Sequence, residues 1–209
     1  MKKRFEYIWL DGSETPRLRS KTRFGDQITP WNFDGGSTGQ GTLEDSDRSL
    51  DPVATYKNPF EEGGYLVLCE VSHYGGKPHS SNHRASLHLS DMQSEGDPWI
   101  GFEQEFTLMH KTSSIPLGVF QLAPKEQGQY YCGVGADNIV GRDIMLEFEK
   151  MCQAAGVEIE GINAEVMPGQ WEYQTPPLSP LKAADNLWIT RYILERICER
   201  KGIIISYDP

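Results

Sequence analysis

Four glutamates in two strand-like segments constrain this chain more than any other feature of its sequence. The first segment, residues 100–107 (IGFEQEFT), alternates charged and aromatic side chains. Because successive side chains of a strand point to opposite faces, Glu103 and Glu105 share one face, while Phe102 and Phe106 point to the other. The pattern therefore predicts a strand with one acidic face and one aromatic face.

The second segment, residues 163–173 (NAEVMPGQWEY), contains the other two glutamates and predicts a hairpin. Pro168 and Gly169 fit the centre of a tight turn. In that arrangement Met167 pairs with Gln170, and the residues on either side of them continue the ladder.

This register places Glu165 directly opposite Glu172. Directly opposed side chains are roughly 5 Å apart, and like charges at that distance repel each other. A fold tolerates such a pair if a cation lies between the carboxylates or if they share a proton. Carboxylates with no His or Cys nearby suit hard cations such as Mg²⁺ or Mn²⁺. The alternative is that these glutamates are solvated on strands that never meet; the flanking aromatic residues, including Trp171, favour the metal site.

Composition limits the classes of partner. The 209 residues carry a formal net charge of −10, which argues against a nucleic-acid backbone or an anionic membrane as the main partner. ATP remains compatible, because a bound cation and local arginines can offset the phosphate charge. The chain is long enough for one large domain or two small ones.

The expected location is the cytoplasm. Four scattered cysteines without a C-x-x-C pair fit a reducing compartment and suggest no zinc site (Cys69, Cys132, Cys152 and Cys198). The basic N-terminus is not followed by the apolar run of a signal peptide. No stretch approaches the roughly 20 apolar residues that a membrane span needs.

Hydrophobic patterning predicts a β-rich first third and an alternation of strands and helices after it. A turn-rich stretch at residues 94–98 is typical of a domain joint. The predicted strands cover residues 5–10, 18–24, 65–71, 99–109 and 203–207, and the predicted helices cover 141–155 and 183–200, each ending at a glycine.

Several segments together resemble the glutamine synthetase family, in the type II form of eukaryotes and some bacteria. The similarity covers nearly the whole chain, and each segment comes in its expected order. It is carried by residues 31–35 (WNFDG), 101–105 (GFEQE), 130–137 (YYCGVGAD), 141–144 (GRDI), 162–172 (INAEVMPGQWE), 191–196 (RYILER) and 207–209 (YDP).

The resemblance implies an α+β fold in two parts. Residues 1–97 resemble the family's N-terminal β-grasp domain, and residues 98–209 resemble the first half of its catalytic domain, an antiparallel sheet with helices. It also implies the family's reaction, in which ATP phosphorylates the γ-carboxylate of L-glutamate and ammonia then displaces the phosphate to give L-glutamine.

The resemblance implies a divided metal and nucleotide site. Three glutamates, namely Glu105, Glu165 and Glu172, would hold one Mg²⁺ or Mn²⁺. Glu103 would hold a second ion near the phosphates of ATP. The nucleotide would be lined by Glu103 and by the segment Glu172, Tyr173, Gln174, Thr175, Pro176 and Pro177.

Asp34 resembles the carboxylate that binds ammonium and removes its proton, with Ser37 nearby. Without the resemblance, an aspartate in an Asp-Gly sequence such as Asp34 is most often a turn residue. Tyr130 and Tyr131 are interpreted as packing residues, with a place at the border of the ammonium pocket as the alternative for one of them. In the family, this aspartate serves the active site of the neighbouring subunit, so the resemblance implies a ring-shaped homo-oligomer, decamer-like in the full-length family, with L-glutamate, ammonium and ATP as ligands.

The sequence departs from the family pattern in three local respects and in its length. Gly36 stands where the family usually has Ser, which predicts a looser Asp34 loop. Residues 175–177 (TPP) replace a Gly-Pro ending and stiffen the backbone beside the nucleotide. Residues 178–184 differ from the family's usual approach to the next helix. The remaining metal ligands, the substrate-binding arginines and the mobile glutamate of the family all follow position 209, so we expect a fragment that binds a metal ion weakly without turnover.

Two other functions stay open at this point. One is a γ-glutamyl ligase for another amine, although Asp34 favours ammonium because a neutral amine needs no carboxylate base there. The other is a non-catalytic truncated homologue that acts as an assembly module. Retention of all four glutamates and of Asp34 argues against it, since an idle scaffold would experience only their repulsion.

Overall fold

The computed structural model describes residues 2–87, 96–119, 126 and 128–208. The chain divides into two compact units, the first comprising Met1–Pro98 with Ala154–Gly156 and the second Trp99–Gln153 with Val157–Pro209. The mixture of sheets and helices is that of an α+β protein, as expected. The domain boundary at residue 97 and the β-grasp assignment stay predictions.

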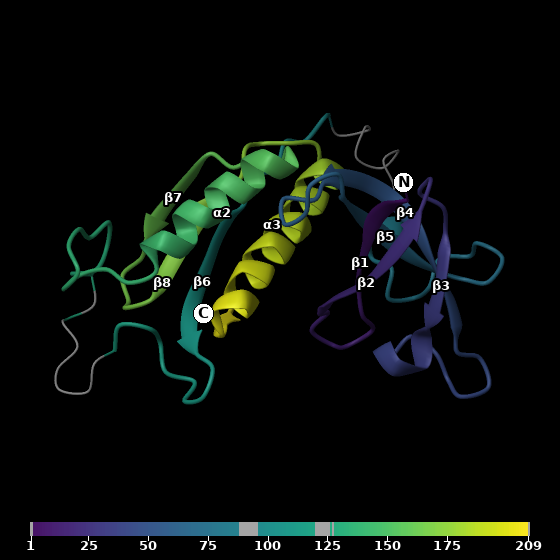
Figure 1. Ribbon diagram of the computed structural model, residues 1–209, viewed down its shortest axis with the longest axis horizontal. Helices are drawn as coiled ribbons and strands as arrows, with labels where there is room; N and C mark the ends of the chain where they lie inside the picture. The colour runs from purple at the N-terminus through teal and green to yellow at the C-terminus, as the bar shows by residue number, and fades with distance from the viewer. Residues whose placement is uncertain (1, 88–95, 120–125, 127, 209) are drawn as a thin grey trace. The chain divides into compact units, whose positions relative to one another are not determined.

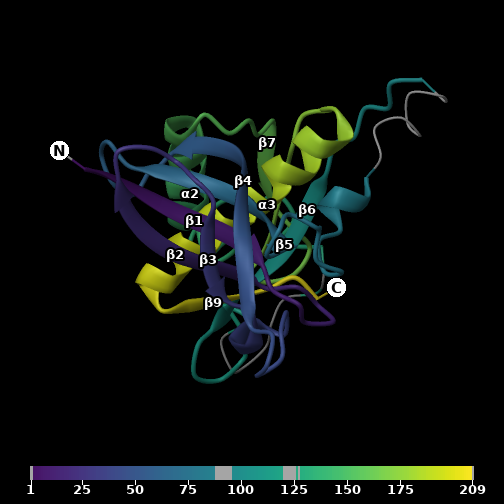
Figure 2. The same ribbon diagram turned by 90° about the vertical axis from the view of Figure 1, so that its right-hand side faces the viewer.

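The first unit is built on a five-stranded sheet in the order β2-β1-β5-β4-β3. Its strands β1 and β5 are parallel, and all other neighbours are antiparallel (Figure 2). The strands predicted near residues 5–10, 18–24 and 65–71 are confirmed. The elements are β1 (Lys3–Leu10), β2 (Leu18–Gly25), β3 (Trp31–Asp34), η1 (Gly35–Thr38), β4 (Asp47–Lys57), β5 (Tyr65–His73) and η2 (Arg84–Ser86).

An aromatic-rich hydrophobic cluster of the first unit lies on one face of this sheet. Alternate residues of β1, namely Phe5, Tyr7 and Trp9, are buried there with residues from β3, β4 and β5. The hydroxyl of Tyr7 satisfies its hydrogen-bonding need by donating to the Thr29 carbonyl oxygen at 2.7 Å. Lys21 on β2 donates to the Asn32 carbonyl oxygen on β3, so side chains link the two edge strands of the sheet.

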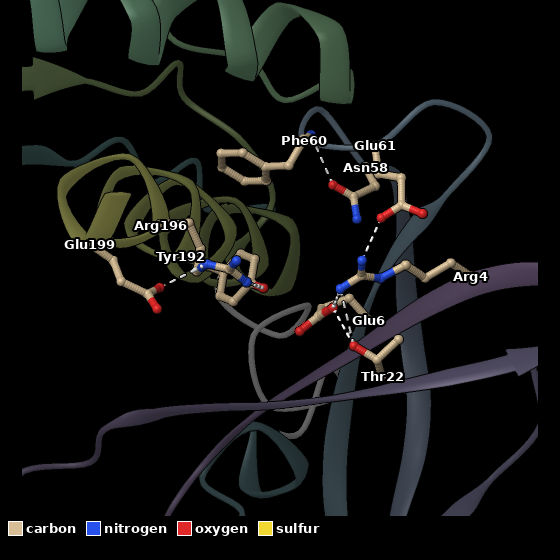
Figure 3. Close-up of polar contacts among 9 residues, drawn as sticks. All are labelled: Arg4, Glu6, Thr22, Asn58, Phe60, Glu61, Tyr192, Arg196 and Glu199. Atoms are coloured by element: carbon tan, nitrogen blue, oxygen red, sulfur yellow. Dashed lines mark hydrogen bonds and ion pairs between the residues drawn. The ribbon is translucent and has the colours of Figure 1, made fainter. Parts of the chain in front are cut away.

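Polar contacts fix the first strands as well. Arg4 donates to Glu6 Oε2 at 3.0 Å and to Thr22 Oγ1 at 3.2 Å, and it also pairs with Glu61 (Figure 3). Burial alone would raise the pKa of Glu6, but hydrogen bonds from Thr22, Ser20 and Arg4 outweigh burial and lower it. The buried carboxylate of Glu6, between β1 and β2, is therefore paired with a cation and hydrogen-bonded.

The second unit has a four-stranded antiparallel sheet in the order β7-β8-β6-β9. The predicted glutamate strand, both helices and the strand near residue 203 are present, although the glutamate strand begins at Glu103 rather than at residue 99 (Figure 1). The hairpin also forms, in a register that differs from the predicted one. The elements are β6 (Glu103–His110), α2 (Arg142–Ala155), β7 (Gly161–Ala164), β8 (Gln170–Gln174), α3 (Pro180–Lys201) and β9 (Ile203–Ser206).

The helix α3 begins three residues before its predicted start. Pro180 occupies the first turn, where its fixed φ suits a helix and its missing N–H is no loss. The helix ends at Gly202, which adopts the left-handed conformation with φ of 68° and donates its N–H to the last turn. The predicted glycine stop is therefore confirmed.

Both helices pack on one face of the second sheet. Tyr173 of β8 is fully buried there; its ring centroid lies 5.0 Å from that of Phe148 on α2, and its hydroxyl lies 2.9 Å from Thr190 Oγ1 on α3. Phe106 and Trp171 share this buried face. The opposite face of the sheet carries the polar side chains of the same strands.

This packing predicts a large effect of one core truncation. Replacing the fully buried Phe148 by Ala should lower the free energy of unfolding of the second unit by about 3–5 kcal/mol, because the ring leaves a cavity against Tyr173. Urea unfolding monitored by circular dichroism measures this value. The control is Leu146→Ala on the same helix, where the side chain is 46% exposed and the expected change is about 0.5 kcal/mol. Equal losses in both variants would contradict the packing described above.

Candidate functional site

The centre of the polar face is a cross-strand pair of glutamates. Glu105 of β6 lies directly opposite Glu172 of β8, and Glu103 lies opposite Gln174. Directly opposed residues of an antiparallel ladder point to the same face, so these four side chains share the face that the helices leave uncovered. Glu172 is only 9% exposed, while Glu103 and Glu105 are exposed.

The predicted register of the second glutamate hairpin is wrong by two residues. Its tight turn is present, because the Gln170 N–H donates to the Met167 carbonyl oxygen at 3.1 Å and Gly169 has a left-handed φ of 73°. The ladder, however, does not start at these residues. The Glu165 N–H donates to the Gln170 carbonyl oxygen, so Glu165 faces Gln170 rather than Glu172.

The physical reason is a longer connection than the Pro-Gly signal suggests. The residues that pair with β8 end at Ala164, and residues 165–169 all belong to the loop. Asn163 consequently occupies the position opposite Glu172. A shift of two residues keeps the same face, so Glu165 remains a diagonal neighbour of Glu172.

Three of the four glutamates influence one another electrostatically. Burial raises the pKa of Glu165, and a hydrogen bond with Glu172 and the negative charges of Glu105 and Glu172 raise it further. The N–H of Val166, which donates to Glu165 Oε2 at 3.1 Å, opposes this shift only in part. A proton or a cation at this place relieves the repulsion.

Each of these three carboxylates accepts a hydrogen bond from a neutral side-chain amide. Gln170 Nε2 donates to Glu105 Oε2 at 2.9 Å, and Asn163 Nδ2 donates to Glu165 Oε1 at 2.9 Å. Gln174 donates to Glu172 Oε1 and also, at 2.7 Å, to Asn163 Oδ1.

The side chains on this face have the chemistry that a hard divalent cation requires, but they are not arranged in a coordination geometry. The side chains offer carboxylate and amide oxygens, which Mg²⁺ and Mn²⁺ prefer. Within the described part of the chain, no Lys or Arg forms an ion pair with Glu105, Glu165 or Glu172. The described residues also contain no cluster of three His, Cys, Asp or Glu side chains already arranged to hold a metal ion. Binding a cation therefore requires these carboxylates to rotate toward a common point.

In the segment predicted to line a nucleotide, residues 172–177, only some of the side chains are accessible. Tyr173 points into the core, and Thr175 is tied to Phe102, whose N–H donates to Thr175 Oγ1 at 2.9 Å. These two residues therefore offer a nucleotide little beyond their backbone. Gln174 and Pro176 are half-buried, and Pro177 is exposed.

Asp34 and Ser37 come together in the first unit. Asp34 ends β3 and caps the 3-10 helix η1. Ser37 Oγ donates to Asp34 Oδ2 at 2.5 Å, and the Gly36 N–H donates to Oδ1 at 3.0 Å. The hydroxyl of Ser37, followed by the backbone N–H groups of Gly36 and Ser37, lowers the pKa of the exposed Asp34 carboxyl, which keeps it charged.

The loop that carries Asp34 is anchored despite its glycines. Gln40 is buried and donates to the Leu10 carbonyl oxygen at 3.0 Å and to Ser81 Oγ at 2.8 Å. It also accepts a hydrogen bond from Thr38 Oγ1 at 2.8 Å. The predicted loosening at Gly36 is thus offset by contacts that sequence patterns do not reveal.

Tyr131, which the sequence assigned to packing, and Cys132, to which it gave no role, are further neighbours of the glutamates. Tyr131 is 55% exposed, so its interpretation as a packing residue is wrong, whereas Tyr130 is buried as expected. Cys132 adopts a left-handed φ of 52° and donates its N–H to the Ala164 carbonyl oxygen beside β7. Contacts with Cys132 and the charges of Glu165 and Glu172 raise the pKa of Tyr131.

Comparison with known proteins identifies the family of the chain. The sequence model of the family described as "Glutamine synthetase, catalytic domain" matches residues 76–209, which include all four glutamates. The chain belongs to the glutamine synthetase family. A solved structure of the same fold, "GmaS/ADP complex-Conformation 1", has a TM-score of 0.75 and 17% identity, over 98% of this chain and 49% of that one.

Several family members are similar over almost the whole chain. Glutamine synthetase cytosolic isozyme 1-1 of Oryza sativa subsp. japonica is 45% identical over 98% of this chain, and cytosolic isozyme 1-3 of Arabidopsis thaliana is 44% identical over the same share. The nodule isozyme of Lupinus angustifolius is 46% identical. The chain spans 60%, 61% and 68% of the lengths of these three relatives. Among the described residues, no helix is long and apolar enough to cross a membrane.

The Asp34 loop yields a prediction about protonation. In Ser37→Ala the pKa of the Asp34 carboxyl should rise toward the ordinary value of about 3.9, because its first hydrogen-bond donor is removed. A carbon-detected NMR titration of the side-chain carboxyl measures this pKa. Asp45 is the internal control, since its pKa is lowered by Arg48 and should not change. An unchanged Asp34 pKa would show that Ser37 does not hold the carboxylate.

Proposed function

We propose that this chain contributes to an enzyme that joins ammonia to L-glutamate at the expense of ATP and forms L-glutamine through γ-glutamyl phosphate. The observation that carries the proposal is the carboxylate face of the second sheet, where Glu105 and Glu172 are directly opposed and Glu165 lies beside them. Family membership supplies the reaction class, and this face supplies the chemistry that phosphoryl transfer needs.

The four glutamates would serve two cation positions. Glu105, Glu165 and Glu172 would hold one Mg²⁺ or Mn²⁺, and Glu103, exposed near the start of the same strand, would hold a second beside the ATP phosphates. Divalent ions bound here would neutralise charge on the transferring phosphoryl group. The chain's own contribution is to place three acidic side chains on one sheet face and Glu165 in the loop beside them, and to keep the core on the other face.

The nucleotide would lie along the end of β8. Here Gln174 and the following residues Thr175, Pro176 and Pro177 would line it, with Tyr173 contributing backbone only. Phe102 and Thr175 exchange backbone and side-chain hydrogen bonds, which fix the path of this segment. A nucleotide would therefore meet a preformed edge rather than a mobile loop.

Asp34 would bind ammonium and accept its proton, with Ser37 orienting the carboxylate. A carboxylate whose pKa is lowered remains charged at neutral pH and attracts a small cation. This preference for charge favours ammonium over a larger neutral amine. We further propose a homo-oligomeric ring, in which Asp34 serves a neighbouring subunit, and a cytoplasmic location like that named for the rice and Arabidopsis isozymes.

The test is an assay of the gene product as it occurs in its native cell, with its mass measured in the same preparation. Glutamine formation from L-glutamate, ammonium and Mg·ATP should be detected and should require the divalent ion. Glu172→Gln should reduce it by at least about 100-fold, because even neighbours of metal ligands contribute up to that factor. The exposed Glu158, which pairs with Lys182, provides the control Glu158→Gln with unchanged activity.

The competing functions give different outcomes in the same assay. Faster product formation with methylamine than with ammonium would favour a γ-glutamyl ligase for another amine. A protein that assembles but consumes no ATP with any amine would favour the assembly module. Either result would reject the proposed reaction.

A further inference from the structure

The amides on the acidic face form a connected chain rather than isolated contacts. Gln174 donates to both Glu172 and Asn163, and Asn163 donates in turn to Glu165. The side chain of Asn163 lies opposite Glu172 in the ladder, so this chain joins the loop after β7 to the middle of β8. The carboxylate of one predicted ligand is thus connected to that of another through two neutral residues.

A separate amide ties the third carboxylate to the same hairpin. Gln170 begins β8, and its side chain reaches across to Glu105 on the neighbouring strand β6. It lies opposite Thr107, one diagonal step from Glu105. Without this bond, Glu105 is an exposed side chain with free rotation on an open sheet face.

A glycine opposite Gln174 leaves room for its side chain. A Cβ added to Gly161 would lie 2.5 Å from Gln174 Oε1, which is closer than real Cβ contacts come. The backbone of Gly161 needs no left-handed conformation, so the space rather than the φ angle requires glycine here. An alanine would displace a flexible side-chain end and leave the strand itself unstrained.

We propose that Asn163, Gln170 and Gln174 are positioning residues for the cation site and that Gly161 keeps Gln174 in place. This inference rests on the proposed function, in which Glu105, Glu165 and Glu172 hold the cation. A carboxylate has about four lone-pair positions, so an amide on one oxygen leaves others for a cation. Neutral donors hold the like-charged carboxylates near one another without supplying a competing positive charge. The carboxylates then need only a small rotation to meet at a common cation.

The experiment measures Mn²⁺ binding to the 209-residue polypeptide by electron paramagnetic resonance of the free ion. Gln170→Met and Gln174→Met keep the side-chain length but remove the hydrogen-bond donor. Each should raise the dissociation constant for Mn²⁺ by about 10–100-fold. Gly161→Ala should act in the same direction. The matched control is Gln153→Met, an exposed amide on α2 that should leave binding within twofold.

A double variant separates positioning from general damage. If Gly161 acts through Gln174, then Gly161→Ala should weaken binding in the wild-type background but change it by less than twofold in the Gln174→Met background. Urea unfolding of each variant identifies any that fail to fold, and the three single variants provide independent routes to the answer. Additive effects in the double variant would overturn the role given to Gly161.

The outcomes distinguish this inference from the function on which it rests. If the wild-type polypeptide does not bind Mn²⁺, the proposed cation site fails and the inference fails with it. If the wild type binds Mn²⁺ and the folded amide variants bind it equally well, the glutamate site stands and the positioning role is rejected. Tighter binding in Gln170→Met and Gln174→Met would also reject it.

Discussion

Repulsion among carboxylates on one sheet face is the constraint on which the second unit depends. Glu105 and Glu172 are directly opposed, and Glu165 lies close enough for its pKa to rise. In a protein that binds no cation here, the repulsion among these carboxylates would only lower the stability of the fold. The opposite face explains how the fold tolerates the cost, since Phe106, Trp171 and Tyr173 bury their rings there under two helices.

The sequence determined much of this picture because its patterns are periodic. Alternation around residue 105 predicted an acidic face and an aromatic face, and both are present. Glycines at the helix ends predicted where α2 and α3 stop. The register of the hairpin was not predictable in this way, because Pro168-Gly169 marks a turn without saying how many loop residues precede it. Direct pairing of β6 with β8 was likewise not predicted, since the two strands are separated by about sixty residues and only tertiary packing brings them together.

In the candidate site, residues that belong to short motifs were predicted, and residues that depend on partners elsewhere in the sequence were missed. Asp34, Ser37 and the four glutamates were identified from short motifs, and the structure places Ser37 on Asp34 as expected. The amides of Asn163 and Gln170 were missed, because carboxamides are common on surfaces and acquire meaning only from the carboxylates they contact. The buried anchor Gln40 was missed for the same reason: its partners Leu10 and Ser81 lie far away in the sequence.

Paramagnetic broadening by Mn²⁺ tests the central claim most directly, because it reports where on the chain the ion binds. With substoichiometric Mn²⁺, backbone NMR signals of β6, β8 and the β7–β8 loop near Glu105, Glu165 and Glu172 should broaden first, and Glu172→Gln should abolish the effect. Broadening centred instead on another acidic stretch, such as the exposed loop around Glu44 and Asp45, would contradict the account. So would a spectrum that Mn²⁺ leaves unchanged.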